Sequence, residues 1–530
     1  MGLKELTQSR IILYTTIFLA TCYNYAFFVN VLKVYPPQIN NIGFLISLYF
    51  VLIAFNGLLF SLISNFYSIK FTLITIIIIS SLTNYFMNNY GIIIDKEMIA
   101  NTIQTDAKES LDLLTFSLVL NLITLGLIPS YFIYRIKIVK QSIKKELLQR
   151  SKYIAIFIVM IVVLLALFGR HYTSFFRENK PLRYNINPTY WIYSTGAYIG
   201  HFLKTENSLF YPIGEDAKIV PQSERKKMIV FVVGESARAD HFSLNGYKKN
   251  TSSPLDNYEI ISFSNFYSCG TSTSYSVPCM FSSFGRSQYS NAKGKQFGNL
   301  LDVLANTGEV AILWRDNNSN SKGQADRVAY QDYKTSKTNP ICESNGECRD
   351  EGMLVGLDQF IASNQDKNIL IVLHQMGNHG PAYYKRYPKE FEKFKPVCNT
   401  NQIENCSVDE IKNTYDNALL YTNYFLSKTI DFLKNYSSTY DTAMFYSSDH
   451  GESLGENGIY LHAMPYMIAP KEQIHIGTLA WFSESFSEKI NTKIDTKKDY
   501  SHDNIFHTML GLFNVQTNVY NKNLDIFIKE

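Results

Sequence analysis

The sequence predicts an α-helical membrane domain of five spans, followed by an α/β domain whose mostly parallel sheet is covered by helices on both faces. Three observations predict this fold. Long apolar runs fill the first 170 of 530 residues, short apolar runs alternate with helical patterns after residue 226, and six of the seven cysteines follow residue 260. We expect a membrane domain at 1–170, a linker at 171–225 and a C-terminal domain at 226–530.

Five runs are long and apolar enough to cross a bilayer core of about 30 Å, which needs about 20 helical residues. They lie at 10–32, 42–64, 70–90, 113–134 and 153–169. A cleaved signal peptide is the alternative for the first run, but four more spans follow it and no small-residue cleavage site is evident.

Orientation follows from the loop between the last two spans, residues 135–152, which carries seven Lys and Arg. Such loops face the cytoplasm. The N-terminus is then also inside, and everything after residue 170 lies outside the cytoplasm.

Residues 171–225 are aromatic, basic and interrupted by prolines. We expect a linker along the membrane surface, with Trp191 at the level of the lipid headgroups. A segment packed on the C-terminal domain is the alternative.

The cysteines after residue 260 form three close pairs: Cys269 with Cys279, Cys342 with Cys348, and Cys398 with Cys406. An even number of cysteines in pairs that are close in sequence indicates disulfides in an oxidising compartment such as a periplasm. Free thiols or a metal cluster are the alternative, but CxxC spacing is missing. The pairing therefore supports the orientation that the basic loop predicts.

The C-terminal domain contains five short apolar runs that we expect to be buried strands, at 226–236, 310–318, 368–379, 442–453 and 476–484, with a helix at 408–435. In mostly parallel sheets, ligands bind at the carboxyl ends of the strands. Six acidic and imidazole side chains lie at those ends here: Glu235, Asp316, His374, His379, Asp449 and His450.

These side chains are the ligand types that zinc prefers. Asp449 and His450 are adjacent, and His462 follows twelve residues later. A lone histidine is more often structural, but several acid and imidazole groups converging on one sheet edge predict a zinc site.

The segment 268–279, which we call the nucleophile loop, holds five aliphatic hydroxyls between its cysteines: Thr271, Ser272, Thr273, Ser274 and Ser276. A Ser or Thr hydroxyl is hardly ionised at neutral pH and needs a base or a metal before it attacks. A disulfide would fix the loop beside the metal, and a helix starting within 271–285 would favour an anionic phosphate. These considerations do not choose among the five hydroxyls.

The chain resembles the membrane-anchored phosphoethanolamine transferases of Gram-negative bacteria, which modify lipid A and include the mobile colistin-resistance enzymes. Four stretches carry the resemblance, which covers essentially the whole chain: VVGESARADHFSLNGY, SCGTSTSYSVPCMFS, LHQMGNHGPAYYKRYP and SDHGESLGENGIYLHAMP. The resemblance implies an alkaline phosphatase and sulfatase fold for the C-terminal domain.

The resemblance also implies which residues act. Thr273 is the nucleophile, and the main zinc is held by that threonine together with Glu235, Asp449 and His450. His379 and His462 contact the phosphoryl group or bind a second zinc. Two weaker substrate contacts are implied, from His374 and Lys322. Ser236, which follows Glu235, is expected to change nothing catalytic.

Between the third and fourth spans, Asn101, Thr105 and Glu109 recur every four residues and would line one helix face. A solvated periplasmic helix is the alternative. The resemblance implies that this face contacts the ethanolamine headgroup of the lipid donor.

The implied reaction is transfer of phosphoethanolamine from phosphatidylethanolamine to lipid A, through a zinc-bound threonine and a covalent phosphoethanolamine–enzyme intermediate. Transfer to a core sugar, a glucan or a surface protein is the nearest alternative. A sulfate or phosphate ester hydrolase is less compatible, because the C/S-x-P-x-R motif of sulfatases is missing, and intact ligands disfavour a non-catalytic sensor. A net charge of +4 is too small to suggest nucleic acid, and we expect a monomer among inner-membrane lipids.

Overall fold

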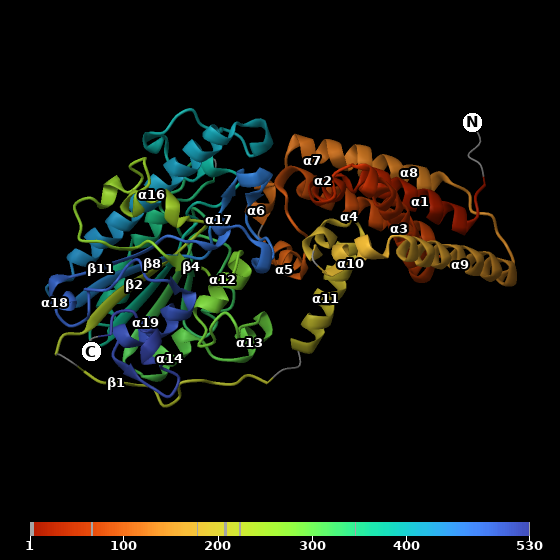
Figure 1. Ribbon diagram of the computed structural model, residues 1–530. Coiled ribbons are helices and arrows are strands. Elements are labelled where there is room, and N and C mark those ends of the chain that lie inside the picture. Colours follow the sequence, from red (N-terminus) through yellow and green to blue (C-terminus); the bar gives the residue numbers. More distant parts are fainter. Residues whose placement is uncertain are drawn as a thin grey trace. The chain divides into compact units, whose positions relative to one another are not determined.

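The computed structural model describes residues 5–64, 67–105, 107–177, 179–205, 209–221, 224–344 and 346–528. It contains two compact units (Figure 1). The helical unit comprises Met1–Ile99 and Leu114–Tyr198, and the sheet unit comprises Ala100–Leu113 and Ile199–Glu530. The short segment between the third and fourth spans therefore folds with the C-terminal domain, which the sequence did not predict.

The helical unit contains the predicted spans. Among its described residues, four are long and apolar enough to cross a membrane: α3 (Ile39–Ile63), α4 (Ile69–Tyr90), Phe116–Arg135 and α9 (Ile143–Leu167). The third of these comprises α7 (Phe116–Asn121), a π-helical turn (Leu122–Leu127) and α8 (Ile128–Arg135). The unit therefore has four such spans, or five if the first predicted run also crosses.

The first predicted run is not one straight helix. It forms α1 (Gln8–Cys22) and α2 (Tyr25–Val34), bent by 58° at the break. The Asn24 side chain occupies this break and exchanges hydrogen bonds with the backbone of Asn187, donating at 2.7 Å and accepting at 3.0 Å. Asn24 Nδ2 also donates to the Leu19 carbonyl at 3.0 Å, so that the same side chain pairs a backbone group at the end of α1.

The basic loop is shorter than predicted, because α9 already begins at Ile143 with Ser142 at its N-cap. The predicted linker forms α10 (Gly169–Arg177), a 3-10 turn (Lys180–Asn185) and α11 (Thr189–Thr205). The Trp191 indole donates to Ser80 Oγ at 3.2 Å. This part of the linker therefore packs within the helical unit.

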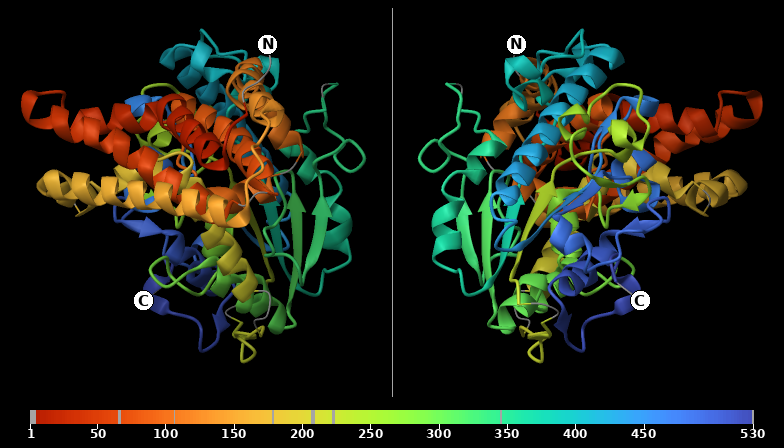
Figure 2. Two further views of the ribbon diagram at one scale, coloured as in Figure 1. Left: turned by 90° about the vertical axis from the view of Figure 1, so that its right-hand side faces the viewer. Right: turned by 90° about the vertical axis from the view of Figure 1, so that its left-hand side faces the viewer.

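The sheet unit is built on a mixed sheet of seven described strands in the order β3-β11-β8-β2-β7-β5-β6. Their bounds are β3 (Ile261–Phe263), β11 (Thr478–Phe482), β8 (Asp441–Ser448), β2 (Lys227–Gly234), β7 (Asn368–His374), β5 (Val310–Asp316) and β6 (Ala329–Asp332). The five strands from β8 to β6 are parallel, and β5 runs beside the edge strand β6 (Figure 2).

The predicted strand at 476–484 is present as β11, but it runs antiparallel to β8. The chain leaves β8 at Ser448, and β11 begins beside that point, because Thr478 pairs with Ser447. A connection that starts and ends at the same edge of a sheet yields an antiparallel pair and needs no crossover helix.

Alternate residues of β2 face opposite sides, as in any strand. Ile229, Phe231 and Val233 pack with α14 (Leu300–Asn306) and α19 (Ile505–Leu512), whereas the residues between them pack with α15 (Leu357–Ala362) and α16 (Val408–Lys434) (Figure 1). The predicted layers, a sheet with helices on both faces, are confirmed.

Three small strand pairs lie outside this sheet in the described part of the chain: β1 (Lys218–Ile219) with β13 (Val515–Gln516), β9 (Ser453–Leu454) with β10 (Tyr460–Leu461), and β4 (Phe266–Tyr267) with β12 (Tyr500–Ser501). The three predicted disulfides are all present.

Candidate metal centre and active site

The four predicted zinc ligands converge at the carboxyl edge of the sheet. Glu235 directly follows β2, Asp449 and His450 directly follow β8, and Thr273 is the first residue of α12 (Thr273–Met280). Because β2 and β8 are parallel neighbours, their ends lie side by side. All four side chains are buried.

The donor atoms have the spacing that a tetrahedral ion requires. Thr273 Oγ1 lies 3.1 Å from Glu235 Oε2 and 3.4 Å from His450 Nε2. His450 Nε2 lies 3.5 Å from Glu235 Oε1 and 3.3 Å from Asp449 Oδ2. Ligand bonds of 2.0–2.1 Å in a tetrahedron give donor–donor separations of about 3.3 Å. The residues present therefore fit zinc.

Electrostatics support the same fit. Burial and the nearby charge of Glu235 raise the pKa of Asp449. Burial alone would raise the pKa of Glu235 as well, but the His450, His379 and His462 side chains outweigh burial and lower this pKa. Among the described residues, Asp449 Oδ2 is buried without a hydrogen-bond partner. A cation bound at Asp449 Oδ2 would stabilise these two adjacent buried carboxylates.

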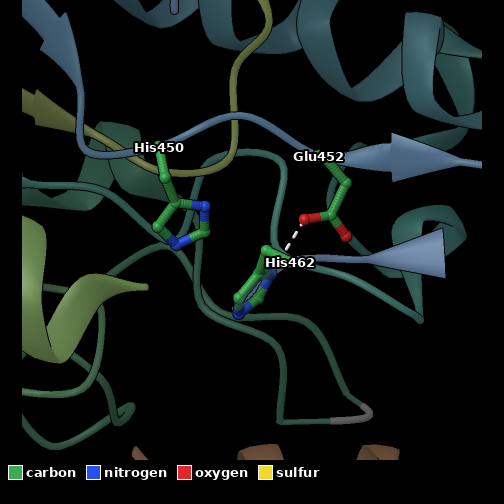
Figure 3. A group of neighbouring side chains, drawn as sticks. All are labelled: His450, Glu452 and His462. Atoms are coloured by element: carbon green, nitrogen blue, oxygen red, sulfur yellow. Dashed lines mark hydrogen bonds and ion pairs between the residues drawn. The ribbon is translucent and has the colours of Figure 1, made fainter. Parts of the chain in front are cut away.

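Glu452 lies among the predicted site residues, and the sequence reasoning missed it. Its carboxylate is buried and lies with His450 and His462 in a second group of three possible metal ligands (Figure 3). Oε2 lies 2.8 Å from His462 Nδ1, and Tyr383 donates its hydroxyl to Oε1 at 2.6 Å. The signal was available, because Glu452 follows His450 by only two residues at a strand end.

Glu452 orients the His462 ring. The bond engages Nδ1 of this ring, and the ring centroid lies 4.3 Å from that of His450. Burial lowers the pKa of His462, but the Glu452 carboxylate outweighs it, and the net shift is upward. His379 is also close to His462: the centroids of their two rings lie 5.9 Å apart.

Ser236 contacts two of the predicted ligands, whereas its expected lack of a catalytic effect stays a prediction. Its backbone is left-handed at φ 56°, an uncommon conformation for a serine. The hydroxyl donates to Glu235 Oε1 at 2.6 Å, and the backbone N–H donates to Asp449 Oδ1 at 3.2 Å. Asn318 donates to the other Glu235 oxygen at 2.9 Å. Both residues therefore orient the ligands.

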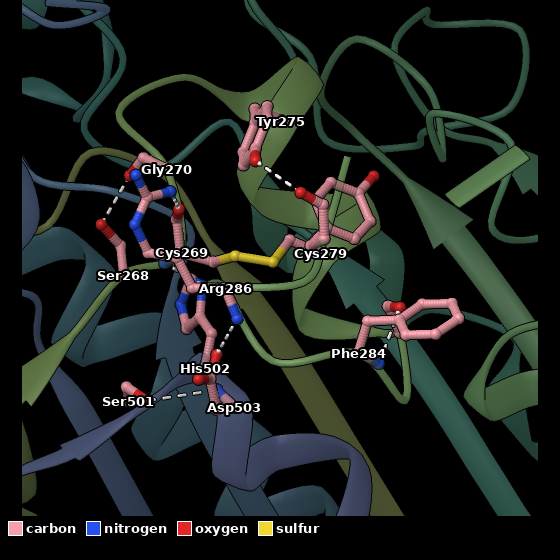
Figure 4. Close-up of a disulfide and its surroundings, with 12 residues drawn as sticks. Ser268, Cys269, Gly270, Tyr275, Cys279, Phe284, Arg286, Ser501, His502 and Asp503 are labelled. Atoms are coloured by element: carbon pink, nitrogen blue, oxygen red, sulfur yellow. Dashed lines mark hydrogen bonds between the residues drawn. A yellow bond between two sulfur atoms is a disulfide. The ribbon is translucent and has the colours of Figure 1, made fainter. Parts of the chain in front are cut away.

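The nucleophile loop is attached to its surroundings at Cys269. The Cys269 N–H donates to His502 Nδ1 at 3.0 Å (Figure 4). His502 Nε2 donates to the Ser448 carbonyl at 3.0 Å, next to the predicted ligand Asp449. Arg286 donates to the Cys269 carbonyl. One neutral imidazole thus bridges the loop to the end of β8.

The loop also holds the segment that carries His462. Thr271 Oγ1 donates to the Met464 carbonyl at 2.6 Å, and Ala463 N–H donates to the Thr271 carbonyl at 2.7 Å. Thr273 and His462 are therefore fixed to one another through Thr271.

His374 is the last residue of β7 and pairs with Asp316, the last residue of β5. His374 is fully buried, with Nδ1 2.8 Å from Asp316 Oδ2. Lys322 lies on the loop after β5, where its Nζ donates to the Ser319 carbonyl at 3.1 Å. Substrate contacts from His374 and Lys322 stay predictions.

The predicted headgroup face is only partly described. Asn101 lies in α5 (Lys96–Gln104), and Thr105 follows the helix end, with its hydroxyl donating to the Asn101 carbonyl at 2.8 Å. Both are partly buried. The side chain of Glu109 lies outside the described residues.

Two families match this chain. The family described as "Sulfatase" matches residues 227–515, and the family described as "Phosphoethanolamine transferase EptA/EptB" matches residues 52–203. The phosphatidylethanolamine transferase Mcr-2 of Escherichia coli is 44% identical over 509 residues, which cover 94% of each chain.

Solved structures agree. The integral membrane protein lipooligosaccharide phosphoethanolamine transferase A of Neisseria meningitidis is 35% identical, with a TM-score of 0.94 over 99% of both chains. The C-terminal periplasmic domain of the phosphoethanolamine transferase EptC of Campylobacter jejuni is 43% identical, with a TM-score of 0.53 over 60% of this chain and 97% of that one. The predicted multi-pass inner-membrane protein with a periplasmic C-terminal domain is confirmed.

Proposed function

Because this chain belongs to the phosphoethanolamine transferase family, we propose that it transfers phosphoethanolamine from phosphatidylethanolamine to lipid A. The observation that carries the proposal is the convergence of Thr273 with three buried metal-ligand side chains at donor spacings of 3.1–3.5 Å. The similar proteins named above act on the same donor or on a lipooligosaccharide, which supports this choice of substrates.

In the first step, Thr273 Oγ1 attacks the phosphorus of phosphatidylethanolamine. The new O–P bond forms while the bond to the glycerol oxygen breaks, so that diacylglycerol leaves and a phosphoethanolamine ester stays on Thr273. A zinc ion held by Glu235, Thr273, Asp449 and His450 would favour loss of the threonine proton and draw negative charge from the phosphoryl group. The start of α12 at Thr273 would also favour an anionic phosphoryl group there, because a helix N-terminus attracts negative charge.

His462 is suited to give a proton to the departing glycerol oxygen. Its Nδ1 is held by Glu452, so that Nε2 is the nitrogen that exchanges protons. Imidazole titrates near neutral pH, which suits a group that gives and then regains a proton. His379 would take up the proton that Thr273 loses and return it in the second step, and the two histidines could exchange these roles.

In the second step, a phosphate oxygen of lipid A attacks the phosphorus of the ester. The bond between Thr273 Oγ1 and phosphorus breaks, the threonine regains its proton, and the product carries one more primary amine. That amine offsets an anionic phosphate and would weaken the binding of cationic peptides.

The test is the mass spectrum of lipid A from cells that express the wild type, Thr273→Ala or Thr273→Ser. We expect one added phosphoethanolamine unit with the wild type, none with Thr273→Ala and a reduced amount with Thr273→Ser, which keeps a hydroxyl. Consumption of phosphatidylethanolamine without a change in lipid A would move the transfer to another acceptor. An untouched donor in wild-type cells would refute the proposed transferase.

A further inference from the structure

Asp112 is a buried carboxylate that the proposed chemistry does not use. It is the last residue of α6 (Ala107–Asp112), in the short segment that the sequence places between two membrane spans. One carboxylate oxygen accepts from Arg386 at 2.8 Å, and the other accepts from Lys385. Asn401 donates to the Asp112 carbonyl at 2.7 Å. This segment is therefore fastened to the sheet unit at its end.

Arg386 connects this anchor to the active site. Its Nε donates to the carbonyl of His379 at 2.8 Å, and its third nitrogen donates to Glu347. Arg386 is 5% exposed and Asp112 is 4% exposed. Burial lowers the pKa of Arg386, but the two carboxylates outweigh it and raise the pKa, while the two cations keep the pKa of Asp112 below its usual value. A buried pair of this kind holds one geometry, because breaking it leaves a charge uncompensated.

We propose that Asp112 and Arg386 are positioning residues that hold the segment Ala100–Leu113 in register with His379, so that a membrane-bound donor meets the nucleophile. This inference rests on the proposed function. The segment is bounded in sequence by membrane spans on both sides, so it lies where the headgroup of a lipid donor is available. A small water-soluble donor reaches the nucleophile without using this segment. The pair should therefore matter for lipid donors and matter little for soluble ones.

The experiment uses the full-length enzyme in phosphatidylethanolamine-containing vesicles and two donors. The first is phosphatidylethanolamine labelled on an acyl chain, with release of labelled diacylglycerol as the readout. The second is p-nitrophenyl phosphoethanolamine, with release of p-nitrophenolate as the readout. We expect Asp112→Asn to lower kcat/KM for the lipid by about 10- to 100-fold, the range expected for small misplacement of a substrate. For the soluble donor, kcat/KM should stay within about 3-fold of wild type, and Asp112→Glu should restore part of the lipid activity.

The matched control is Asp441→Asn. Asp441 is also a buried carboxylate shared by two cations, Arg225 and Lys489, but it begins β8 and so lies at the opposite edge of the sheet from the site. Its loss should leave the ratio of lipid to soluble turnover unchanged. Urea unfolding of each variant checks that it is folded.

An equal loss for both donors in Asp112→Asn, or no loss for either, would overturn the inference. A wild-type enzyme that turns over the soluble donor but never the lipid would instead overturn the proposed function. The two failures are therefore distinguishable.

Discussion

Replacing His502 with asparagine should make the C-terminal domain less sensitive to acid. His502 is buried between Cys269 and Ser448, where burial is the main cause that lowers its pKa to about 3. An unfolded histidine has a pKa near 6.5. Because the folded pKa lies below the unfolded one, the unfolded state binds the proton first. The full stability is therefore present above pH 6.5 and is lost as the pH falls from 6.5 toward 3.

The size of the effect follows from these two values. Each unit of pH below 6.5 costs 1.36 kcal/mol while His502 stays neutral in the folded state. Lowering the pH from 7 to 5 should therefore cost about 2 kcal/mol through this one residue. An asparagine keeps an oxygen near the position of Nδ1 but loses the bond to Ser448, so the variant should be about 1–3 kcal/mol less stable at pH 7.

Equilibrium urea unfolding at pH 7 and pH 5 measures the difference. Two of the three tryptophans, Trp314 and Trp481, lie in the sheet, and a Trp191→Phe background makes their fluorescence the only tryptophan signal. Thr271→Val is the control, because it removes a buried hydrogen bond without removing a titrating group. The acid-induced loss should be about 2 kcal/mol smaller in His502→Asn than in the wild type or the control. An equal loss in all three proteins would refute the reasoning.

Three further predictions concern the site. Thr271→Val leaves the Met464 carbonyl without its donor and should cost about 1–3 kcal/mol, whereas Thr271→Ser should cost less; unfolding midpoints compare the two. Gly377→Ala should lower zinc content, measured by metal analysis, because Gly377 has φ 48° and a Cβ there would lie 3.1 Å from the backbone oxygen and Cβ of Glu235. A normal zinc content in Gly377→Ala would show that this contact does not displace Glu235. Glu452→Gln should lower kcat about 10- to 100-fold with folding intact, because the histidine that it orients loses its charged partner; unchanged kcat would exclude this role.

Much of the fold could be predicted because each part has a strong local pattern. The apolar runs predict the spans, and buried strands such as β2 and β7 are continuous apolar segments ended by polar residues. The direction of β11 could not be predicted, because it depends on where the preceding connection ends in space. The break at Asn24 was equally hidden, since its partner, Asn187, lies far along the chain.

The convergence of Glu235, Asp449 and His450 at one edge of the sheet could be predicted because these residues directly follow strands. Residues that support them could not, because their roles arise from contacts between distant segments. In the sequence nothing distinguishes Ser236 from other serines, whereas the structure shows its left-handed backbone. Asp112 gains its role only through Arg386, more than 270 residues later.

The separation of the ligands along the chain also bears on when the metal centre forms. The ligand side chains run from Glu235 to His450, and they meet only where β2 and β8 lie side by side. A site of this kind does not exist in the unfolded chain. The ion that we propose would be captured after export, once the domain has folded outside the cytoplasm. Its supply would then be the zinc of the periplasm, so a host that withholds zinc outside the cell would withhold it from this enzyme too.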